Sequence, residues 1–166
     1  MEQTKTYAIS ERRTLTVNYM KEDDSVNVRI QDKFNENRCA LLTASRWAVL
    51  LAKVDIIDEA LNNLFAGVDD VDLRHHLGSA WWILVKSAYY FGVDIHKCSL
   101  PRDGKQQKLA GPGITLAWEE WNSLKQLIPM IHEHYRPLST DLPCHQYPMH
   151  DHQVCLECNP SSLHKH

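Results

Sequence analysis

Hydrophobic and polar residues alternate in the first part of the chain, in two runs separated by a charged turn. Residues 14–19 and 26–30 alternate on either side of the turn 21–25. A period of two is typical of a strand with one buried face. The two runs therefore predict a β-hairpin. The short apolar run 39–42 predicts a further strand.

The pattern then changes to a helical period. From Trp47 to about Ala66, apolar residues recur every three or four positions, which predicts one amphipathic helix. Thr43 or Ser45 is a suitable N-cap, and Gly67 ends the helix because glycine accepts the left-handed conformation at a helix terminus.

The second half predicts a similar order of elements after an acidic connector, 68–72. His75 and His76 are expected in a turn. The strands are expected at 80–85, 89–95, 106–110 and 114–116.

A second amphipathic helix follows, and a turn is expected before it at Gly111-Pro112-Gly113. Glu119 and Glu120 fall in the first turn of this helix, where the helix dipole favours anions. Pro129 lies inside the periodic run, so a kink or a break is expected there.

The two helical segments resemble each other at a fixed offset of 74 residues. The matched pairs are Leu42 and Leu116, Trp47 and Trp121, Leu50 and Leu124, Val54 and Ile128, and Ile57 and Ile131. Matches at one offset without a gap indicate an internal duplication, although two unrelated amphipathic helices can also match in this way.

Composition restricts the class of protein. The chain has 166 residues, of which 43% are hydrophobic and 23% charged, as in an ordinary globular protein. Its net charge of −3 predicts no general attraction to polyanions, so a nucleic-acid surface requires a local group of cations. We expect an intracellular protein without a membrane span, because no signal peptide is visible and the longest apolar run, 80–85, is too short.

The residues around the second helix carry a family resemblance. The segment 113–125 contains Gly-Ile-Thr-Leu, then Trp121 and Leu124-Lys125, and the segment 93–95 reads Val-Asp-Ile. This order of residues resembles the transcriptional coactivators of the positive cofactor four family. In the first half Tyr7-Ala8-Ile9 resembles the family's first strand, but the interval from the second strand to the helix is shorter here.

The resemblance implies a fold and a function. It implies an α+β chain with two β-β-β-β-α units, residues 1–67 and 73–136, whose curved antiparallel sheets and packed helices form an intramolecular pseudo-dimer. It further implies single-stranded DNA binding in transcription, replication or repair, a nuclear location, and transcription or replication proteins as partners. An unpaired edge in each sheet would also allow two chains to dimerise.

Binding of a single strand requires aromatic rings for the bases and cations for the phosphates. Tyr7, Trp47 and Trp121 match aromatic positions of the family, but Trp47 and Trp121 also lie on apolar stripes that suit core packing. Trp81 and Trp82 are neighbours on a strand, so at least one of them is expected in the core. The candidates are Tyr7, Arg12, Arg13, Arg29, Lys33, Trp47, Trp82, Lys86, Lys97, Lys105, Lys108, Trp121 and Lys125.

The tail, residues 137–166, is rich in cysteine and histidine. Cys155-Leu156-Glu157-Cys158 has the spacing with which two thiolates bind one zinc ion from a tight turn. Cys144 and one of His145, His150 and His152 would complete a tetrahedral set. We select Cys144, His150, Cys155 and Cys158, although a histidine-rich tail without a metal has a similar composition.

No arrangement typical of an enzyme is present. The sequence contains no glycine-rich phosphate loop, no His-Glu-x-x-His and no nucleophile elbow. The expected function is therefore non-catalytic. The alternative is a protein-interaction scaffold that kept the duplicated fold and lost nucleic-acid binding.

Overall fold

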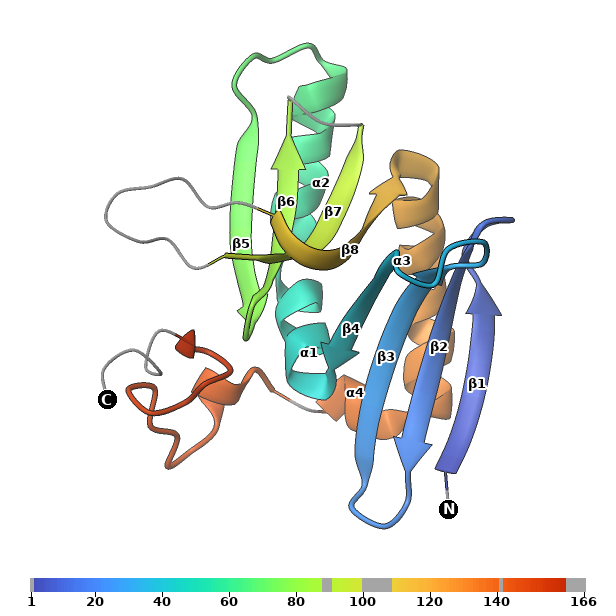
Figure 1. Ribbon diagram of the computed structural model, residues 1–166, viewed down its shortest axis with the longest axis vertical. Coiled ribbons are helices and arrows are strands. Elements are labelled where there is room, and N and C mark those ends of the chain that lie inside the picture. Colours follow the sequence, from blue (N-terminus) through green and yellow to red (C-terminus); the bar gives the residue numbers. More distant parts are fainter. Residues whose placement is uncertain (1, 88–90, 100–108, 141, 161–166) are drawn as a thin grey trace.

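The computed structural model describes residues 2–87, 91–99, 109–140 and 142–160, and Figure 1 shows the arrangement. Two four-stranded antiparallel sheets are present, each with its strands in sequence order. The first sheet holds β1 (Glu2–Ala8), β2 (Arg13–Met20), β3 (Ser25–Asp32) and β4 (Cys39–Thr43). The second holds β5 (Asp72–Gly78), β6 (Trp81–Lys86), β7 (Gly92–Cys98) and β8 (Leu109–Ala117). The helices are α1 (Ala44–Ala52), α2 (Val54–Phe65), α3 (Trp118–His134) and α4 (Arg136–Thr140), followed by the 3-10 helix η1 (Cys144–Gln146).

The expected α+β class with antiparallel sheets is confirmed. Strand β5 corrects one expectation, because His75 and His76 lie in a strand and not in a turn. In this strand Leu73, His75 and Leu77 alternate with more polar residues. Partly buried imidazoles thus occupy positions that a hydrophobicity pattern reads as polar.

Strand β8 corrects a second expectation. Gly111-Pro112-Gly113 is not a turn, since these residues are part of a long strand at the edge of the second sheet. An edge strand tolerates a proline, which has no N–H to donate. A side chain at Gly113 would overlap the ring of His96, so this glycine permits the close approach of β7.

The helices follow the sequence patterns with two differences. Thr43 caps α1, as expected, because its hydroxyl accepts a hydrogen bond from the backbone N–H of Arg46 at 3.2 Å. Lys53 interrupts the single helix expected in the first half and separates α1 from α2. Gly67, with φ of +76°, follows the end of α2. Helix α3 continues through Pro129 and is not broken there.

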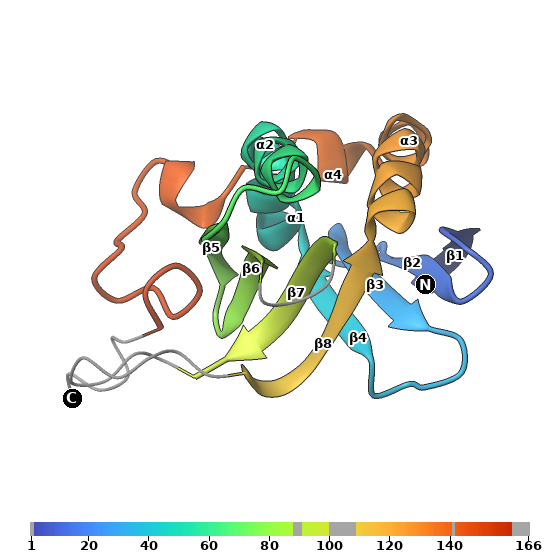
Figure 2. The same cartoon turned by 90° about the horizontal axis from the view of Figure 1, so that it is seen from above.

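The helices lie on one side of the two sheets, as the view in Figure 2 shows. One continuous core fills the space between the helices and the sheets, and it includes residues from β1 to α4. The two sheets approach each other at strands β4 and β8. We call the other side of each sheet its helix-free face.

The helices are shared between the sheets. Helix α2, which follows the first sheet in sequence, packs against β5 and β6 of the second sheet. Helix α3 reaches the first sheet, where Tyr7 Oη lies 2.7 Å from His134 Nδ1 and Ser10 Oγ donates to Glu120 at 2.6 Å. Each half thus supplies part of the cover of the other.

The two tryptophans of the repeated pattern bond across the halves in the same way. Trp47 Nε1 donates to His132 Nε2 at 2.9 Å, and Trp121 Nε1 donates to Asp58 Oδ1 at 2.8 Å. His132 follows Asp58 by 74 residues, the same offset that separates Trp121 from Trp47. Burial lowers the pKa of His132, which favours the neutral ring that accepts this bond.

The first residues of the tail segment, 137–140, belong to α4, and Leu138 of this helix is buried in the common core. Within the described ranges, no helix is both long and apolar enough to cross a bilayer.

Candidate functional site

The helix-free face of the second sheet carries an aromatic row. The strand register places His76 beside Trp82, Trp82 beside His96, and His96 beside Gly113. The rings of His76 and Trp82 have centroids 5.0 Å apart. Trp82 Nε1 is buried and has no hydrogen-bond partner among the described residues. Trp81, its neighbour, points into the core with 2% exposure, as one of the pair was expected to do.

The helix-free face of the first sheet has a different chemistry. Its corresponding row consists of Thr6, Thr16, Arg29 and Leu41 on successive strands. The hydroxyls of Thr6 and Thr16 lie 3.1 Å apart. Arg29 Nε is buried and, within the described part of the chain, has no hydrogen-bond partner. These four residues offer hydrogen-bonding groups and one cation but no aromatic ring.

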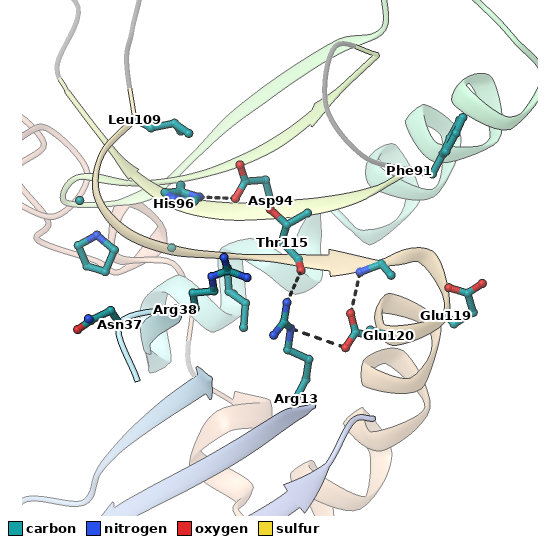
Figure 3. Close-up of a pocket in the computed structure, with 15 residues that line it drawn as sticks. Arg13, Asn37, Arg38, Phe91, Asp94, His96, Leu109, Thr115, Glu119 and Glu120 are labelled. Carbon is teal, nitrogen blue, oxygen red and sulfur yellow. Dashed lines mark hydrogen bonds and ion pairs between the residues drawn. The ribbon is translucent and has the colours of Figure 1, made fainter. Parts of the chain in front are cut away.

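A cavity of about 920 Å³ lies between the two sheets. Figure 3 shows Arg38 and Asn37 on one side of it and His96 and Asp94 of β7 on the other. Backbone of 111–113 forms part of its wall. A smaller cavity beside it is lined by Arg29, Asn37 and Pro112 among others, so the cavities form one groove that we call the inter-sheet groove.

Arg13 is a structural cation within this groove. It is paired with Asp32, which is 1% exposed, and its Nε lies 3.7 Å from Glu120 Oε2. Its Nη2 also approaches the carbonyl oxygen of Thr115 at 3.5 Å (Figure 3). Arg13 thus connects the first sheet to β8 and α3, and its charge is already compensated by carboxylates.

Three of the aromatic candidates are buried. Trp47 and Trp121 are at most 1% exposed, and Tyr7 is 6% exposed. Burial raises the pKa of the Tyr7 hydroxyl, which contacts His134. As placed, these rings pack in the core and make cross-half hydrogen bonds, so we do not include them in a stacking surface.

The cationic candidates are dispersed. Arg12 is exposed in the connection between β1 and β2, where it also lies 3.5 Å from Asp32, and Lys33 is exposed directly after β3. Lys125 Nζ lies 3.0 Å from both carboxylate oxygens of Asp58, which makes it a structural ion pair. Lys97 lies over the ring of Trp81 at 5.6 Å, and Lys86 is partly buried at the end of β6. Lys105 and Lys108 lie outside the described residues.

Several exposed residues were missed by the sequence interpretation. Phe65, Phe91 and Trp118 form a cluster, with ring centroids 5.4 Å apart for Phe65–Phe91 and for Phe65–Trp118. Their exposures are 52%, 59% and 40%. Phe34 and Arg38 were also missed. Of these residues, only Trp118 could have been identified from the sequence. It directly precedes the predicted helix, and it does not belong to the apolar positions that repeat along that helix.

The tail brings the four expected metal ligands together. The ligand atoms of Cys144, His150, Cys155 and Cys158 all lie within 4.8 Å of one another. His150 Nε2 is 3.0 Å from Cys158 Sγ, and the sulfurs of Cys144 and Cys155 are 4.0 Å apart. His152 Nδ1 also lies 3.0 Å from Cys158 Sγ, so a second imidazole stands beside the cluster. These residues form a site that is compatible with a metal ion.

The donor set fits zinc. Tetrahedral zinc with bonds of about 2.0–2.3 Å places its ligand atoms roughly 3.3–3.8 Å apart, close to the distances above. Three soft sulfurs and one imidazole suit zinc, whereas calcium and magnesium prefer oxygen ligands. Burial and the neighbouring thiols of Cys155 and Cys144 raise the pKa of Cys158 to about 12. A bound cation would reverse this effect, because thiols bind metals as thiolates.

Comparison of the chain with family models, curated proteins and solved structures finds no match.

Proposed function

We propose that this chain binds single-stranded DNA, without catalysis, on the helix-free faces of its two sheets. The observation that carries the proposal is a pair of buried donors, Trp82 Nε1 and Arg29 Nε, one on each face, that have no hydrogen-bond partner among the described residues. Buried donors without partners are rare and cost about 1–3 kcal/mol each. Movement of the two side chains on binding would bring these donors to phosphate and base oxygens, while the ring of Trp82 would stack on a base.

We further propose that the chain is an internal duplication that folds as an intramolecular pseudo-dimer. The equal strand orders of the two sheets support this. So do the cross-half bonds of Trp47 and Trp121, whose acceptors Asp58 and His132 are separated by the same 74 residues as the tryptophans. A duplicated binding module would place two related surfaces beside one groove.

The distribution of charge restricts how the DNA would bind. With a net charge of −3 the chain has no general attraction to phosphate, and Arg13 and Lys125 are compensated by carboxylates. Arg29 and Arg38 line the inter-sheet groove, and Lys33 is exposed directly after β3, so we take these three as the cations that would contact phosphates. We therefore expect moderate affinity with few ionic contacts.

The test is a fluorescence anisotropy titration with labelled oligo-dT and a duplex of equal length at 50 and 200 mM salt. We expect the single strand to bind more tightly than the duplex, and its affinity to fall as salt rises, because each neutralised phosphate releases counterions. Absence of binding to oligo-dT at the lower salt concentration would refute the proposal.

We propose zinc as the ion of the tail site, with Cys144, His150, Cys155 and Cys158 as ligands. Zinc would supply a fixed tetrahedral centre that folds this segment, which holds little apolar material of its own. Elemental analysis of the purified chain tests this. One equivalent of zinc is expected, and Cys155→Ser should lose it.

A protein-interaction scaffold is the second candidate function, and the cluster of Phe65, Phe91 and Trp118 favours it. Three large rings in contact and 40–59% exposed are typical of a protein-binding surface. The two functions are separable, since Trp118→Ala should leave oligo-dT affinity unchanged if the helix-free faces bind DNA.

A further inference from the structure

The segment that holds the metal ligands is attached to both halves of the molecule through Glu157, which lies between Cys155 and Cys158. Its carboxylate accepts two hydrogen bonds from Arg46 of α1, with 3.0 Å between Nη2 and Oε2. Its backbone carbonyl accepts a hydrogen bond from the N–H of Ser79 at 2.6 Å. Ser79 lies in the turn between β5 and β6, so one residue joins a helix that follows the first sheet to a turn of the second.

The body of the protein is shaped to receive this residue. A side chain at Gly78 would overlap the carboxylate of Glu157, so the glycine leaves the space that the carboxylate fills. Arg46 and Glu157 are 14% and 25% exposed, which shields their bidentate pair from solvent. Near them the backbone N–H of Cys144, another ligand, donates to Ser45 Oγ at 2.9 Å. The metal segment is therefore docked on the body at its ligands.

The docking point is connected to the aromatic row of the second sheet. Ser79 adopts a left-handed backbone conformation, with φ of 51°, which a non-glycine residue keeps only when its surroundings hold it there. Its N–H is held by Glu157, and its carbonyl oxygen lies 2.7 Å from His76 Nε2. His76 in turn packs against Trp82. A continuous series of contacts thus runs from the metal ligands to the ring proposed to stack on a base.

We infer that zinc in the tail acts as a clasp: it holds Glu157 against Arg46 and Ser79, and so stabilises the contact between the halves and the positions of His76 and Trp82. Without the ion, Cys155 and Cys158 no longer fix the turn that presents Glu157. The bidentate pair with Arg46 then costs the chain more conformational entropy to form. The statement about the halves stands without DNA binding, whereas the statement about Trp82 rests on the proposed function.

The positions of the tryptophans make the clasp measurable. The five tryptophans are residues 47, 81, 82, 118 and 121, and none lies in the tail. Thermal unfolding of the full chain, followed by tryptophan fluorescence with zinc or with a chelator, therefore reports the body alone. We expect zinc to raise the unfolding temperature of the wild type by at least about 3 °C, because a ligand that binds only the folded state stabilises it.

Glu157→Ala and Arg46→Met should both reduce this zinc-dependent rise by half or more, with zinc content measured in parallel. Glu59→Ala, at an exposed position on α2, is the matched control and should retain the full rise. Loss of zinc from Arg46→Met, which is no ligand, would also support the clasp, because coupling between two sites is reciprocal. No rise in the wild type, or an equal rise in the wild type and in both variants, would overturn it.

A second measurement separates the clasp from DNA binding. Removal of zinc should weaken oligo-dT binding by at least about 5-fold, the lower end of ordinary coupling between sites. If the wild type binds no oligo-dT but shows the zinc-dependent rise, the proposed function fails and the clasp between the halves stands. If oligo-dT binds equally with and without zinc, the link to Trp82 is refuted.

Discussion

The helix-covered and helix-free sides of the two sheets differ in how far the two halves agree. On the covered side, Trp47 and Trp121 occupy matching positions, are almost fully buried and donate to matching positions of the opposite half. On the helix-free side the two halves differ. The first sheet has a row that contains Arg29, whereas the second sheet has a row that contains His76 and Trp82. Packing against the helices constrains the covered side of both halves in the same way, whereas the helix-free sides are not constrained to be alike. We therefore expect stability to depend equally on both halves and binding to depend mainly on the second.

Removal of either buried tryptophan should have the largest effect. Trp47→Ala and Trp121→Ala should each lower the free energy of unfolding by about 3–5 kcal/mol, because each leaves a cavity and removes the cross-half hydrogen bond to His132 or to Asp58. Urea denaturation followed by circular dichroism measures this. Trp118→Ala, at a 40% exposed ring, is the matched control and should cost less than about 1 kcal/mol. A large loss in only one of the two buried variants would contradict the equivalence of the halves.

The next effect concerns binding and should distinguish the two helix-free faces. Trp82→Ala should weaken oligo-dT binding by about 1–3 kcal/mol, the usual contribution of one base–aromatic stack. Thr16→Ala, in the corresponding row of the first sheet, should change the free energy of oligo-dT binding by only a small fraction of the loss in Trp82→Ala. Both are read from anisotropy titrations, with circular dichroism to verify folding. Equal losses would show that the first face contributes as much as the second.

Acidification should weaken the cross-half bond between Trp47 and His132. Burial lowers the pKa of His132 in the folded chain below the ordinary value near 6.5 that it has in the unfolded chain. Between these two pKa values the unfolded chain binds more protons than the folded chain, so protonation favours unfolding there. Stability from this histidine is complete above pH 6.5 and is lost as the pH falls below it. Loss of the bond from Trp47 should cost about 1 kcal/mol.

The control for this pH dependence is His132→Gln, which keeps an acceptor for Trp47 without a titrating ring. The difference in the free energy of unfolding between wild type and variant, measured by urea denaturation from pH 7.5 to 5.5, should change with pH in the stated direction. A constant difference would mean that His132 does not titrate in this window.

The smallest effect should appear in the salt dependence of binding. Arg29→Gln and Lys33→Gln should each reduce the slope of log affinity against log salt by about 1 if the side chain contacts a phosphate. Lys125→Gln, whose cation is paired with Asp58, should leave the slope unchanged. An unchanged slope in Arg29→Gln would remove the first sheet from the DNA path.

Local patterns predicted most of the elements, and long-range packing decided the rest. Alternation identified β2 and β3, and the helical period identified α3, because one face of each is uniformly apolar. The same reasoning missed β5, where a half-buried His75 reads as polar. It also took Gly111-Pro112-Gly113 for a turn, although these residues run along an edge strand beside His96.

Site residues could be predicted from the sequence where they follow a characteristic spacing, and could not be predicted where they do not. Cys155 and Cys158 have a spacing with geometric meaning, so the expected metal ligands come together as predicted. Stacking candidates have no such spacing. Trp47 and Trp82 look alike in sequence, and only the arrangement of helices against sheets buries the first completely and the second in part.

The most direct test is a photocrosslinking experiment with 4-thiothymidine-substituted oligo-dT, followed by peptide mass spectrometry of the full chain. The result expected is crosslinks concentrated on β5, β6 and β7 around His76, Trp82 and His96, with minor products at Arg29. Crosslinks confined to Phe65, Phe91 and Trp118, or the absence of any crosslink above the duplex control, would contradict binding on the helix-free faces.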